Sequence, residues 1–352
     1  MAGMIPRCEL RSDYDISRII KGGWQLSEGH SQALSDDPVA DMFAFVEQGI
    51  DTFDCADIYT GVEALIGRFI AANRQRAEPL AVRVHTKYVP DYGELGQLTK
   101  AKVEQIIDRS LSRLGVEQLD MVQFHWWNYA APGCEQAAQW LAELQQAGKI
   151  ALLSLTNFNS EQTRALLEAG LTLATTQVQY SLLDPRPEKS LIGLCREHGM
   201  QLLCYGSLAG GFLSDRWLGE PDPTAPGGPG LDNRSLIKYR LMIEEAGGWD
   251  ALQDLLGGLK AVADRHQSSI ASVAARWVLD QPQVAAVILG ARNAAHVDRC
   301  EQIFRLKLDE EDRAVIAALR GQLGVPAGDV FDLERDKNGP HGRIMKYDLN
   351  SD

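Results

Sequence analysis

Short apolar, strand-like segments alternate with amphipathic helical segments along this chain, and the alternation repeats eight times. Several strand-like segments are almost continuously apolar, which is typical of parallel strands covered on both faces. Eight strand–helix units in one chain predict an α/β fold of the (β/α)8 TIM-barrel type. An open doubly wound sheet would require a GxGxxG motif after the first strand, where this chain has Gly22, Gly23 and Trp24. The strand-like segments are residues 16–23, 49–57, 81–88, 119–126, 150–157, 175–182, 201–207 and 284–290.

The eight units predict a single domain over residues 1–352 with two additional segments. Residues 214–248, which include the sequence PDPTAPGGPG, follow the seventh strand and are expected to form a long loop insertion. In a barrel such a loop lies on the face where the carboxyl ends of the strands meet and where chemistry takes place. Residues 325–352 form a polar C-terminal tail, in which Ile344 and Met345 predict packing against the rest of the chain.

Charge and composition disfavour several classes of partner. The formal net charge of −13 argues against nucleic acid and anionic membranes, because both require a positive surface. No apolar run approaches the roughly 18 residues of a membrane span, and the amino terminus lacks the apolar core of a secretory signal. The six cysteines form no CxxC pair, which favours free thiols and a cytoplasmic location. The histidines show no metal-binding spacing, so no metal site is expected.

Four polar residues lie at or just beyond the ends of predicted strands: Asp54, Tyr59, Lys87 and His125. Strand ends converge on one face of a barrel, so these side chains are expected to meet. A phenol with a pKa of about 10 is a weak proton donor at neutral pH, and a neighbouring lysine lowers that pKa. An aspartate keeps the lysine charged, and a histidine can orient or polarise a substrate oxygen.

This combination predicts a tuned general acid that reduces a carbonyl, or the corresponding base that oxidises an alcohol. No protein side chain supplies a hydride, so a nicotinamide or flavin cofactor is implied.

Each of the four residues also has an ordinary structural interpretation. Asp54 can cap a turn, and Tyr59 can be an exposed loop aromatic. Lys87 can be a solvated strand-end charge, and His125 can be a packed core histidine. Their joint placement at converging strand ends favours the catalytic interpretation. His85, two residues before Lys87, points to the same side of its strand but deeper, and it is interpreted as structural.

The motifs around these residues resemble those of the aldo-keto reductase superfamily over nearly the whole chain. The segment GIDTFDCADIYTGVEALIG is similar to the family's DTAxxYG signature, and HTK supplies Lys87. LDMVQFHW, GKIALLSLTNF, TQVQYSLL and CYGSLAGGFL are similar to the motifs of the fourth to seventh strands. The resemblance implies reduction of aldehydes, ketones or sugars. Hydride would pass from nicotinamide C4 to the carbonyl carbon, and Tyr59 would protonate the oxygen.

The resemblance also implies which residues bind cofactor and substrate. Thr156, Asn157 and Gln177 would hydrogen-bond the nicotinamide carboxamide, and Tyr205 would stack on the nicotinamide ring. The loop that meets the pyrophosphate would comprise Gly206, Ser207, Leu208 and Gly210. The border between nicotinamide and substrate would be formed by Gly22, Gly23, Trp24 and Asp54. The substrate itself would contact Trp24, Tyr59, His125 and Trp126.

The end of the eighth strand departs from the family pattern. Many members carry a lysine, an arginine and a Glu-Asn pair there, which hold the adenosine 2′-phosphate. This chain has Gly290 in place of the lysine, His296 in place of the arginine and Arg299 at the start of the pair. Arg292 can pair with a 2′-phosphate or stack on adenine. These four residues are the expected adenosine contacts, and the pattern favours NADP(H) over NAD(H) while leaving NAD(H) open.

Two other functions are compatible with the sequence. A barrel of this kind can bind the cofactor as a regulatory or channel-subunit-like protein with little turnover. A Schiff-base lyase would use Lys87 as its nucleophile, but a charged lysine beside an aspartate is a poor nucleophile. The main hypothesis takes a small-molecule carbonyl, alcohol or sugar as substrate. Nothing in the sequence identifies that substrate, the direction of the reaction or the oligomeric state.

Overall fold

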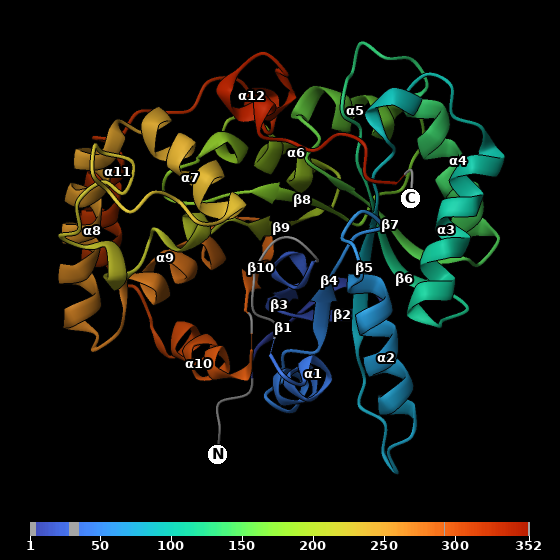
Figure 1. The fold of residues 1–352 in the computed structure, drawn as a ribbon, viewed down its shortest axis with the longest axis horizontal. Coiled ribbons are helices and arrows are strands. Elements are labelled where there is room, and N and C mark those ends of the chain that lie inside the picture. The colour runs from blue at the N-terminus through green and yellow to red at the C-terminus, as the bar shows by residue number, and fades with distance from the viewer. Residues whose placement is uncertain (1–4, 28–34, 292, 351–352) are drawn as a thin grey trace.

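A closed barrel of eight parallel strands forms the centre of the protein (Figure 1). The computed structural model describes residues 5–27, 35–291 and 293–350. Neighbouring strands follow the order of the chain, and the last strand pairs with the first to close the barrel, so the predicted (β/α)8 fold is confirmed. The barrel strands are β3 (Ile19–Gly22), β4 (Thr52–Asp54), β5 (Arg83–Tyr88), β6 (Leu119–Phe124), β7 (Ile150–Thr156), β8 (Thr175–Gln179), β9 (Gln201–Tyr205) and β10 (Val284–Gly290).

Helices surround the barrel and follow its strands, as the alternating pattern predicts (Figure 1). The helix after β5 illustrates the local signals: the Thr99 hydroxyl accepts a hydrogen bond from the Lys102 amide at its start, and Gly115 ends it with a φ of 67°. Among the described residues, no helix has both the length and the apolar character needed to cross a bilayer. The outer helices are α1 (Pro38–Glu47), α2 (Val62–Arg74), α3 (Lys100–Leu114), α4 (Cys134–Gln146), α5 (Ser160–Glu168), α6 (Leu191–Glu197), α9 (Ile270–Leu279) and α10 (Val297–Arg305).

An antiparallel hairpin of β1 (Arg7–Arg11) and β2 (Tyr14–Ser17) precedes the barrel and is absent from the elements expected from the sequence. Its Leu10, Tyr14 and Ile16 are buried in one cluster with Met121 and Leu203, which lie near the middle of barrel strands. The hairpin therefore packs against the interior of the barrel, and the carboxyl ends of the strands are left to form the functional face.

The segment 214–248, expected as a loop insertion, combines a long loop with a helix. It contains α7 (Arg234–Glu245), which leads directly into the unexpected α8 (Gly248–Arg265). Asn233 caps α7 by accepting a hydrogen bond from the Leu236 amide. The Pro- and Gly-rich stretch in the first half of the segment forms the expected loop, whereas the apolar residues at helical spacing after it form α7.

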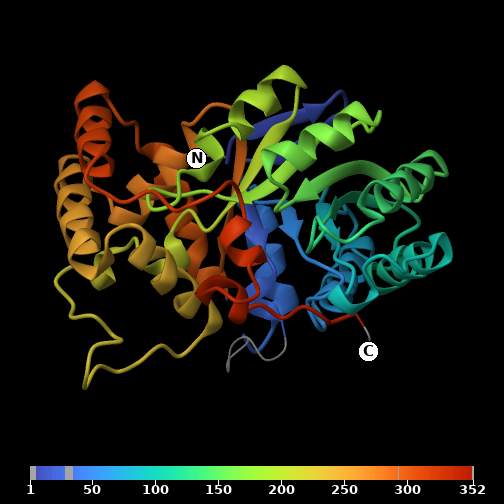
Figure 2. The same ribbon diagram turned by 90° about the horizontal axis from the view of Figure 1, so that it is seen from above.

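The C-terminal tail crosses the carboxyl-end face of the barrel. It leaves α11 (Glu310–Arg320), forms the short helices α12 (Asp332–Arg335) and α13 (Pro340–Arg343), and runs towards α3 and α4 (Figures 1 and 2). Near its end, the buried Asn350 donates hydrogen bonds to Asp57 Oδ2 at 2.9 Å and to the Val89 carbonyl. The prediction that the tail packs against the chain is therefore confirmed.

Candidate active site

A cavity of about 390 Å³ opens at the carboxyl ends of the strands, where a barrel places its active site. The structure brings the four predicted catalytic residues together on its lining: Asp54, Tyr59, Lys87 and His125. The residues predicted to meet nicotinamide and pyrophosphate line the same cavity: Thr156, Asn157, Gln177, Tyr205, Gly206, Ser207, Leu208 and Gly210.

Lys87 and Asp54 form a buried ion pair at the base of the cavity. Lys87 Nζ lies 2.7 Å from Asp54 Oδ2 and donates a second hydrogen bond, also of 2.7 Å, to the Cys55 carbonyl. Burial opposes the lysine charge, but the attraction of Asp54 and Tyr59 outweighs it and holds the pKa of Lys87 above its ordinary value. Lys87 therefore stays a cation, as the sequence hypothesis requires.

Tyr59 lies beside this pair, with Lys87 Nζ 4.9 Å from the centre of its ring. Burial raises the pKa of the Tyr59 phenol above its ordinary value, and the opposing Lys87 charge offsets this only in part. The expected lysine effect is present in direction, but in the cofactor-free chain burial outweighs it. The phenol is therefore protonated at neutral pH, which is the form that donates a proton to a carbonyl oxygen.

His125 is neutral, and its protonation pattern restricts what it can do. Its Nδ1 lies 3.1 Å from the Thr156 carbonyl, and a carbonyl oxygen only accepts, so the proton is assigned to Nδ1. Burial, with a contribution from Arg335, lowers the pKa of His125 to about 3. Its Nε2 is buried without a partner among the described residues. In this form Nε2 can accept a hydrogen bond but cannot polarise a carbonyl by donating one, so that part of the sequence hypothesis needs correction.

Two glutamines complete the base of the site. Gln177 Nε2 lies 2.6 Å from Asp54 Oδ1 and 2.8 Å from Gln123 Oε1, and Gln123 Nε2 lies 3.0 Å from the same aspartate oxygen. Because the side-chain nitrogen of Gln177 makes both of these bonds, its side-chain oxygen, Oε1, is left to accept a hydrogen bond from a ligand. Gln123 was missed by the sequence reasoning, although its position two residues before His125 on β6 places it on the same face.

Asn157 and Tyr205, the predicted nicotinamide neighbours, are bonded to each other. The Tyr205 hydroxyl donates to Asn157 Oδ1 at 2.8 Å, and the Asn157 amide donates to the Gln177 carbonyl at 2.9 Å. Asn157 has a φ of 61°, a left-handed conformation that asparagine tolerates better than most residues. This turn carries the chain out of β7 and places Asn157 on the lining of the cavity.

The loop after β9 has the features of a phosphate-binding loop. Ser207 Oγ is buried, lines the cavity and has no hydrogen-bond partner among the described residues. Gly206 and Gly210 have positive φ angles, and a Cβ on either would lie within 2.7 Å of the Tyr239 side chain of α7. The glycines thus allow α7 to pack closely over the loop. The orphaned Ser207 hydroxyl fits a bound phosphate oxygen.

The cavity is cationic although the chain is strongly acidic. Among its described lining residues, Asp54 is the single carboxylate, and its charge is matched by Lys87. Arg234 from α7 and Lys346 from the tail add two more positive side chains, whereas the charge of Lys238, also on the lining, is paired with the buried Glu334. Against a net charge of −13, this reversal of sign fits a polyanionic ligand such as a dinucleotide. These residues were not identified from the sequence, because they come from segments expected to be loop and tail.

Of the two tryptophans after β6, Trp127 lines the cavity and Trp126 does not. Trp126 is fully buried, packs against Phe124 and donates its indole N–H to the Asn128 carbonyl at 2.9 Å. It is not among the residues that line the cavity, whereas Trp127 is. The cavity lining therefore does not support the expected substrate contact at Trp126. Trp24 lines the cavity as expected, with its ring 5.0 Å from that of Tyr59.

The remaining predicted residues fall into three groups. Gly22 and Gly290 line the cavity, whereas Gly23 lies beside it and donates its amide to the Asp54 carbonyl at 2.8 Å. His296 and Arg299, at the start of α10, are not among the lining residues, so these two expected adenosine contacts are not brought to this cavity. Arg292 lies outside the described residues.

One cluster outside the cavity has metal-ligating groups. Ligand atoms of His266, Asp309 and Asp312 lie within 4.8 Å of one another. Asp309 and Asp312 form the capping box that begins α11, and His266 Nε2 lies 2.7 Å from Asp312 Oδ2. These bonds explain the cluster as a helix cap, so the prediction of no metal site stays a prediction.

A protonated phenol beside a charged lysine can exchange a proton with a carbonyl oxygen but cannot supply a hydride, so this barrel and its site define an oxidoreductase that depends on a redox cofactor. The chain belongs to the aldo/keto reductase family, whose model matches residues 18–320. It is accordingly an NAD(P)H-dependent oxidoreductase that interconverts carbonyl and alcohol groups.

The chain is similar to several characterised members. Aldo-keto reductase YhdN of Bacillus subtilis is 26% identical over 329 residues, which cover 90% of this chain and 94% of that protein. The NADH-specific methylglyoxal reductase of Escherichia coli is 26% identical over 222 residues, which cover 62% of this chain and 64% of that protein. The solved structure of the glycerol dehydrogenase AKR11B4 from Gluconobacter oxydans has a TM-score of 0.72 at 26% identity, and the match covers 87% of this chain and 92% of that one.

Proposed function

We propose that this enzyme reduces an aldehyde or ketone, or oxidises the corresponding alcohol, with Tyr59 as the proton donor or acceptor. The observation that carries the proposal is the buried Lys87–Asp54 pair beside the protonated Tyr59 phenol, all lining one cavity. A bound nicotinamide supplies or accepts the hydride. In reduction, the Tyr59 hydroxyl donates its proton to the carbonyl oxygen, and the Lys87 charge stabilises the phenolate that remains.

His125 supports the same reaction as a hydrogen-bond acceptor. Its unpartnered Nε2 accepts from the alcohol hydroxyl, which holds the substrate oxygen next to Tyr59 in the oxidation direction. Its neutral state keeps a second positive charge away from the hydride donor. Trp24 and Trp127 flank this position and exclude water from it.

The cofactor that these residues fit is NADP(H) in preference to NAD(H). Thr156, Asn157 and Gln177 would bind the carboxamide, and the loop at Ser207 would hold the pyrophosphate. The positive side chains lining the cavity and the sequence position of Arg292 support a third phosphate on the ligand. The NADH-specific E. coli relative is the counterexample within the family, so the preference needs a direct measurement.

The buried ion pair of Lys87 with Asp54 opposes the lyase alternative. A Schiff-base nucleophile must lose its proton, whereas Asp54 holds Lys87 charged. All six cysteines are free thiols, which suits a reducing compartment, and we assign the enzyme to the cytoplasm on that basis.

The test is oxidation of NADPH and NADH across a panel of aldoses, aromatic aldehydes and ketones, for the wild type and Tyr59→Phe. We expect the substitution to lower kcat by about 10²–10⁴-fold, because it removes the proton donor, and to leave the Kd for NADPH within about twofold. Wild-type turnover by Tyr59→Phe would refute the proton-donor role. Tight cofactor binding by the wild type with no turnover on any substrate would favour the regulatory alternative.

Cofactor preference is tested separately with Arg292→Ala. This change should weaken NADPH binding by more than tenfold while changing NADH binding little, because the expected partner is the 2′-phosphate. Equal losses for the two cofactors would remove Arg292 as the 2′-phosphate contact.

A further inference from the structure

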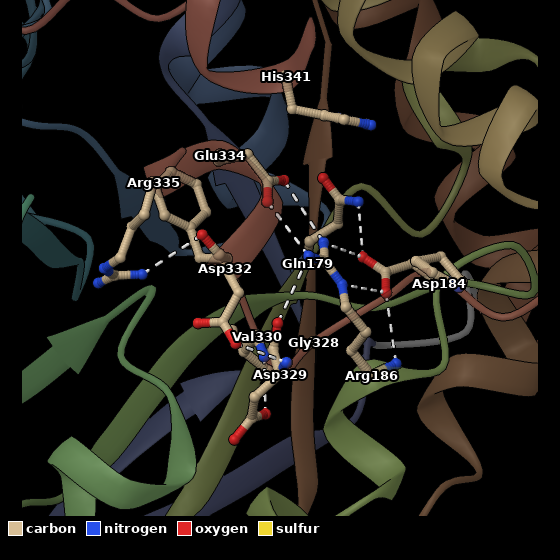
Figure 3. Close-up of polar contacts among 12 residues, drawn as sticks. Gln179, Asp184, Arg186, Gly328, Asp329, Val330, Asp332, Glu334, Arg335 and His341 are labelled. Carbon is tan, nitrogen blue, oxygen red and sulfur yellow. Dashed lines mark hydrogen bonds and ion pairs between the residues drawn. The ribbon is translucent and has the colours of Figure 1, made fainter. Parts of the chain in front are cut away.

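One short helix of the tail contacts the nicotinamide-binding residues from two sides. In α12, the consecutive residues Glu334 and Arg335 extend in different directions (Figure 3). Glu334 points towards Arg186, which follows β8 in the barrel, whereas Arg335 points towards the ends of β6 and β7. The helix thus connects to both halves of the nicotinamide site.

The Glu334 side chain is fixed by a buried ionic network (Figure 3). Glu334 Oε2 lies 3.2 Å from Arg186 Nη1, and Arg186 makes two bonds of 2.8 Å to Asp184. Asp184 in turn accepts from Gln179 Nε2, at the end of β8, at 2.7 Å. Burial opposes the Glu334 charge, but Lys238 and Arg186 outweigh it and lower the pKa of Glu334 to about 2. Glu334 is therefore a fixed anion joined to the barrel.

This anion holds Lys238 of α7 against the Tyr205 ring. Glu334 Oε1 lies 3.6 Å from Lys238 Nζ, and that nitrogen lies 5.0 Å from the centre of the Tyr205 ring and 5.5 Å from that of Phe331. A cation at this distance from an aromatic face is attracted to it. Because Lys238 is held by Glu334, the tail restrains the position of the Tyr205 ring.

Arg335 is bonded to Asn157, the second of the two residues proposed to hold the nicotinamide. Its Nη2 donates to the Asn157 carbonyl at 2.7 Å and to the Trp126 carbonyl at 2.9 Å. Its guanidinium group lies 4.0 Å from the centre of the Tyr129 ring, which fixes its plane. The bond to the Asn157 backbone carbonyl stabilises the left-handed turn that places Asn157 on the lining of the cavity.

The two arms meet, because the Tyr205 hydroxyl donates to Asn157 Oδ1 at 2.8 Å. The contacts therefore form a closed circuit from Glu334 through Lys238, Tyr205 and Asn157 to Arg335. We propose that α12 positions the nicotinamide: Glu334, acting through Lys238, and Arg335 set the orientation of Tyr205 and Asn157. This inference rests on the proposed function, in which those two residues hold the nicotinamide.

The circuit predicts that α12 controls hydride transfer rather than substrate fit alone. Hydride transfer requires the donor and acceptor carbons to be aligned, and a displacement of about 1 Å can cost about 100-fold in rate. Tyr205 and Asn157 lie at the ends of different strands, so the orientation of their two side chains relative to each other depends on this set of contacts. The adenosine half of the cofactor is not part of the circuit.

The test uses the full chain with Lys238→Met and Arg335→Met. Lys238→Met leaves the Glu334–Arg186 pair intact, so it is the variant expected to fold normally. The matched control is Lys189→Met, because Lys189 also donates to tail carbonyls, those of Pro326 and Gly328, but does not reach the circuit. The measurements are the single-turnover rate of hydride transfer from NADPH and the Kd values for NADPH and 2′,5′-ADP.

We expect both variants to slow hydride transfer by about tenfold or more and to raise the Kd for NADPH, with the Kd for 2′,5′-ADP unchanged. The double variant should lose less than the product of the single losses, because both changes release the same Tyr205–Asn157 pair. Arg335→Lys should restore part of the rate, since it keeps a donor to the carbonyls.

Three results would overturn the proposal. The first is wild-type hydride transfer in Lys238→Met and Arg335→Met, both shown to be folded by circular dichroism. The second is an equal loss of NADPH and 2′,5′-ADP affinity, which would indicate general loosening. The third is a loss of hydride transfer in the Lys189→Met control as large as in Lys238→Met. A wild-type protein that binds no NADPH would instead refute the proposed function.

Discussion

The base and the cover of the cavity are built in different ways. The base consists of side chains on neighbouring barrel strands, which bond to one another at 2.6–3.0 Å: Asp54, Lys87, Gln123 and Gln177. The cover consists of α7 and the tail over residues 325–350, which are joined to each other and to the barrel by ion pairs and by hydrogen bonds to backbone carbonyls. Strand register sets the base, whereas contacts between distant parts of the chain set the cover.

This difference predicts that substitutions in the base and substitutions in the cover have different effects on the enzyme. Charges in the base are buried and compensate one another, so removing one leaves its partner unpaired in a site that excludes water. Contacts in the cover join segments that are far apart in the sequence, and they act on how ligands are held. Changes in the base should therefore affect stability and the chemical step, and changes in the cover should mainly affect binding and alignment.

The largest effect is expected from Asp54→Asn in the base. This variant leaves the Lys87 charge, about 5% exposed, without its anion, so the free energy of unfolding should fall by about 3–5 kcal/mol. Turnover should fall by about 10²-fold or more, because Lys87 loses its orientation. Urea unfolding and steady-state kinetics measure both.

The control Asp51→Asn breaks a partly exposed pair with Arg7 and should cost less than about 1 kcal/mol. A stable, active Asp54→Asn enzyme would contradict this account of the base.

A smaller loss of stability should follow from lowering the pH, and His85, which lies beneath the base, should cause it. Burial lowers the pKa of His85 to about 4, and its Nε2 lies 3.2 Å from the Tyr14 hydroxyl. In the unfolded chain the ordinary pKa is about 6.5, so between pH 6.5 and 4 the unfolded state binds more protons and stability falls as pH falls. The expected loss from this group is about 3 kcal/mol.

The measurement is the free energy of unfolding of the wild type and His85→Gln at pH 7 and pH 4.5. The variant should lose less stability over this range than the wild type does. His198→Gln, at an exposed histidine, is the control and should follow the wild type. An unchanged slope in His85→Gln would show that other groups, such as His125, carry the acid sensitivity.

The smallest effect is expected in the cover, from Asn350→Ala. Asn350 anchors the end of the tail to Asp57 and Val89, and the neighbouring Leu349 lines the cavity. Loss of these hydrogen bonds should cost about 1–2 kcal/mol of stability and raise the KM for substrate several-fold, with kcat close to the wild type. Asn338→Ala, at an exposed tail position, should change neither constant. A fall in kcat without a change in KM would place this end of the tail in the chemical step.

Much of the base could be predicted because it follows from strand geometry. Asp54 ends β4, Lys87 lies near the end of β5, and His125 follows β6, so converging strands bring them together. Trp126, expected at the substrate but buried away from the cavity, shows where this reasoning fails. Strand β6 ends at Phe124, and beyond it the alternation of side chains no longer predicts which residue faces the cavity.

The electronic state of the site was also beyond prediction. Sequence indicates that a lysine and a histidine stand near Tyr59, but the pKa of each group depends on how deeply it is buried and on which atoms it contacts. Burial keeps the Tyr59 phenol protonated, and the Thr156 carbonyl assigns the His125 proton to Nδ1. These two facts turn His125 from an expected donor into an acceptor.

The sequence by itself determined the barrel and the four residues at its strand ends, because both arise from patterns that repeat within a few residues and from the shared direction of parallel strands. Only the tertiary structure decided that α7 and the tail complete the site. The contact between Arg186 and Glu334 joins residues 148 positions apart, and no local periodicity encodes such a pairing. It forms because the folded chain buries both charges in one place, where Asp184 and Lys238 complete a network of opposite charges.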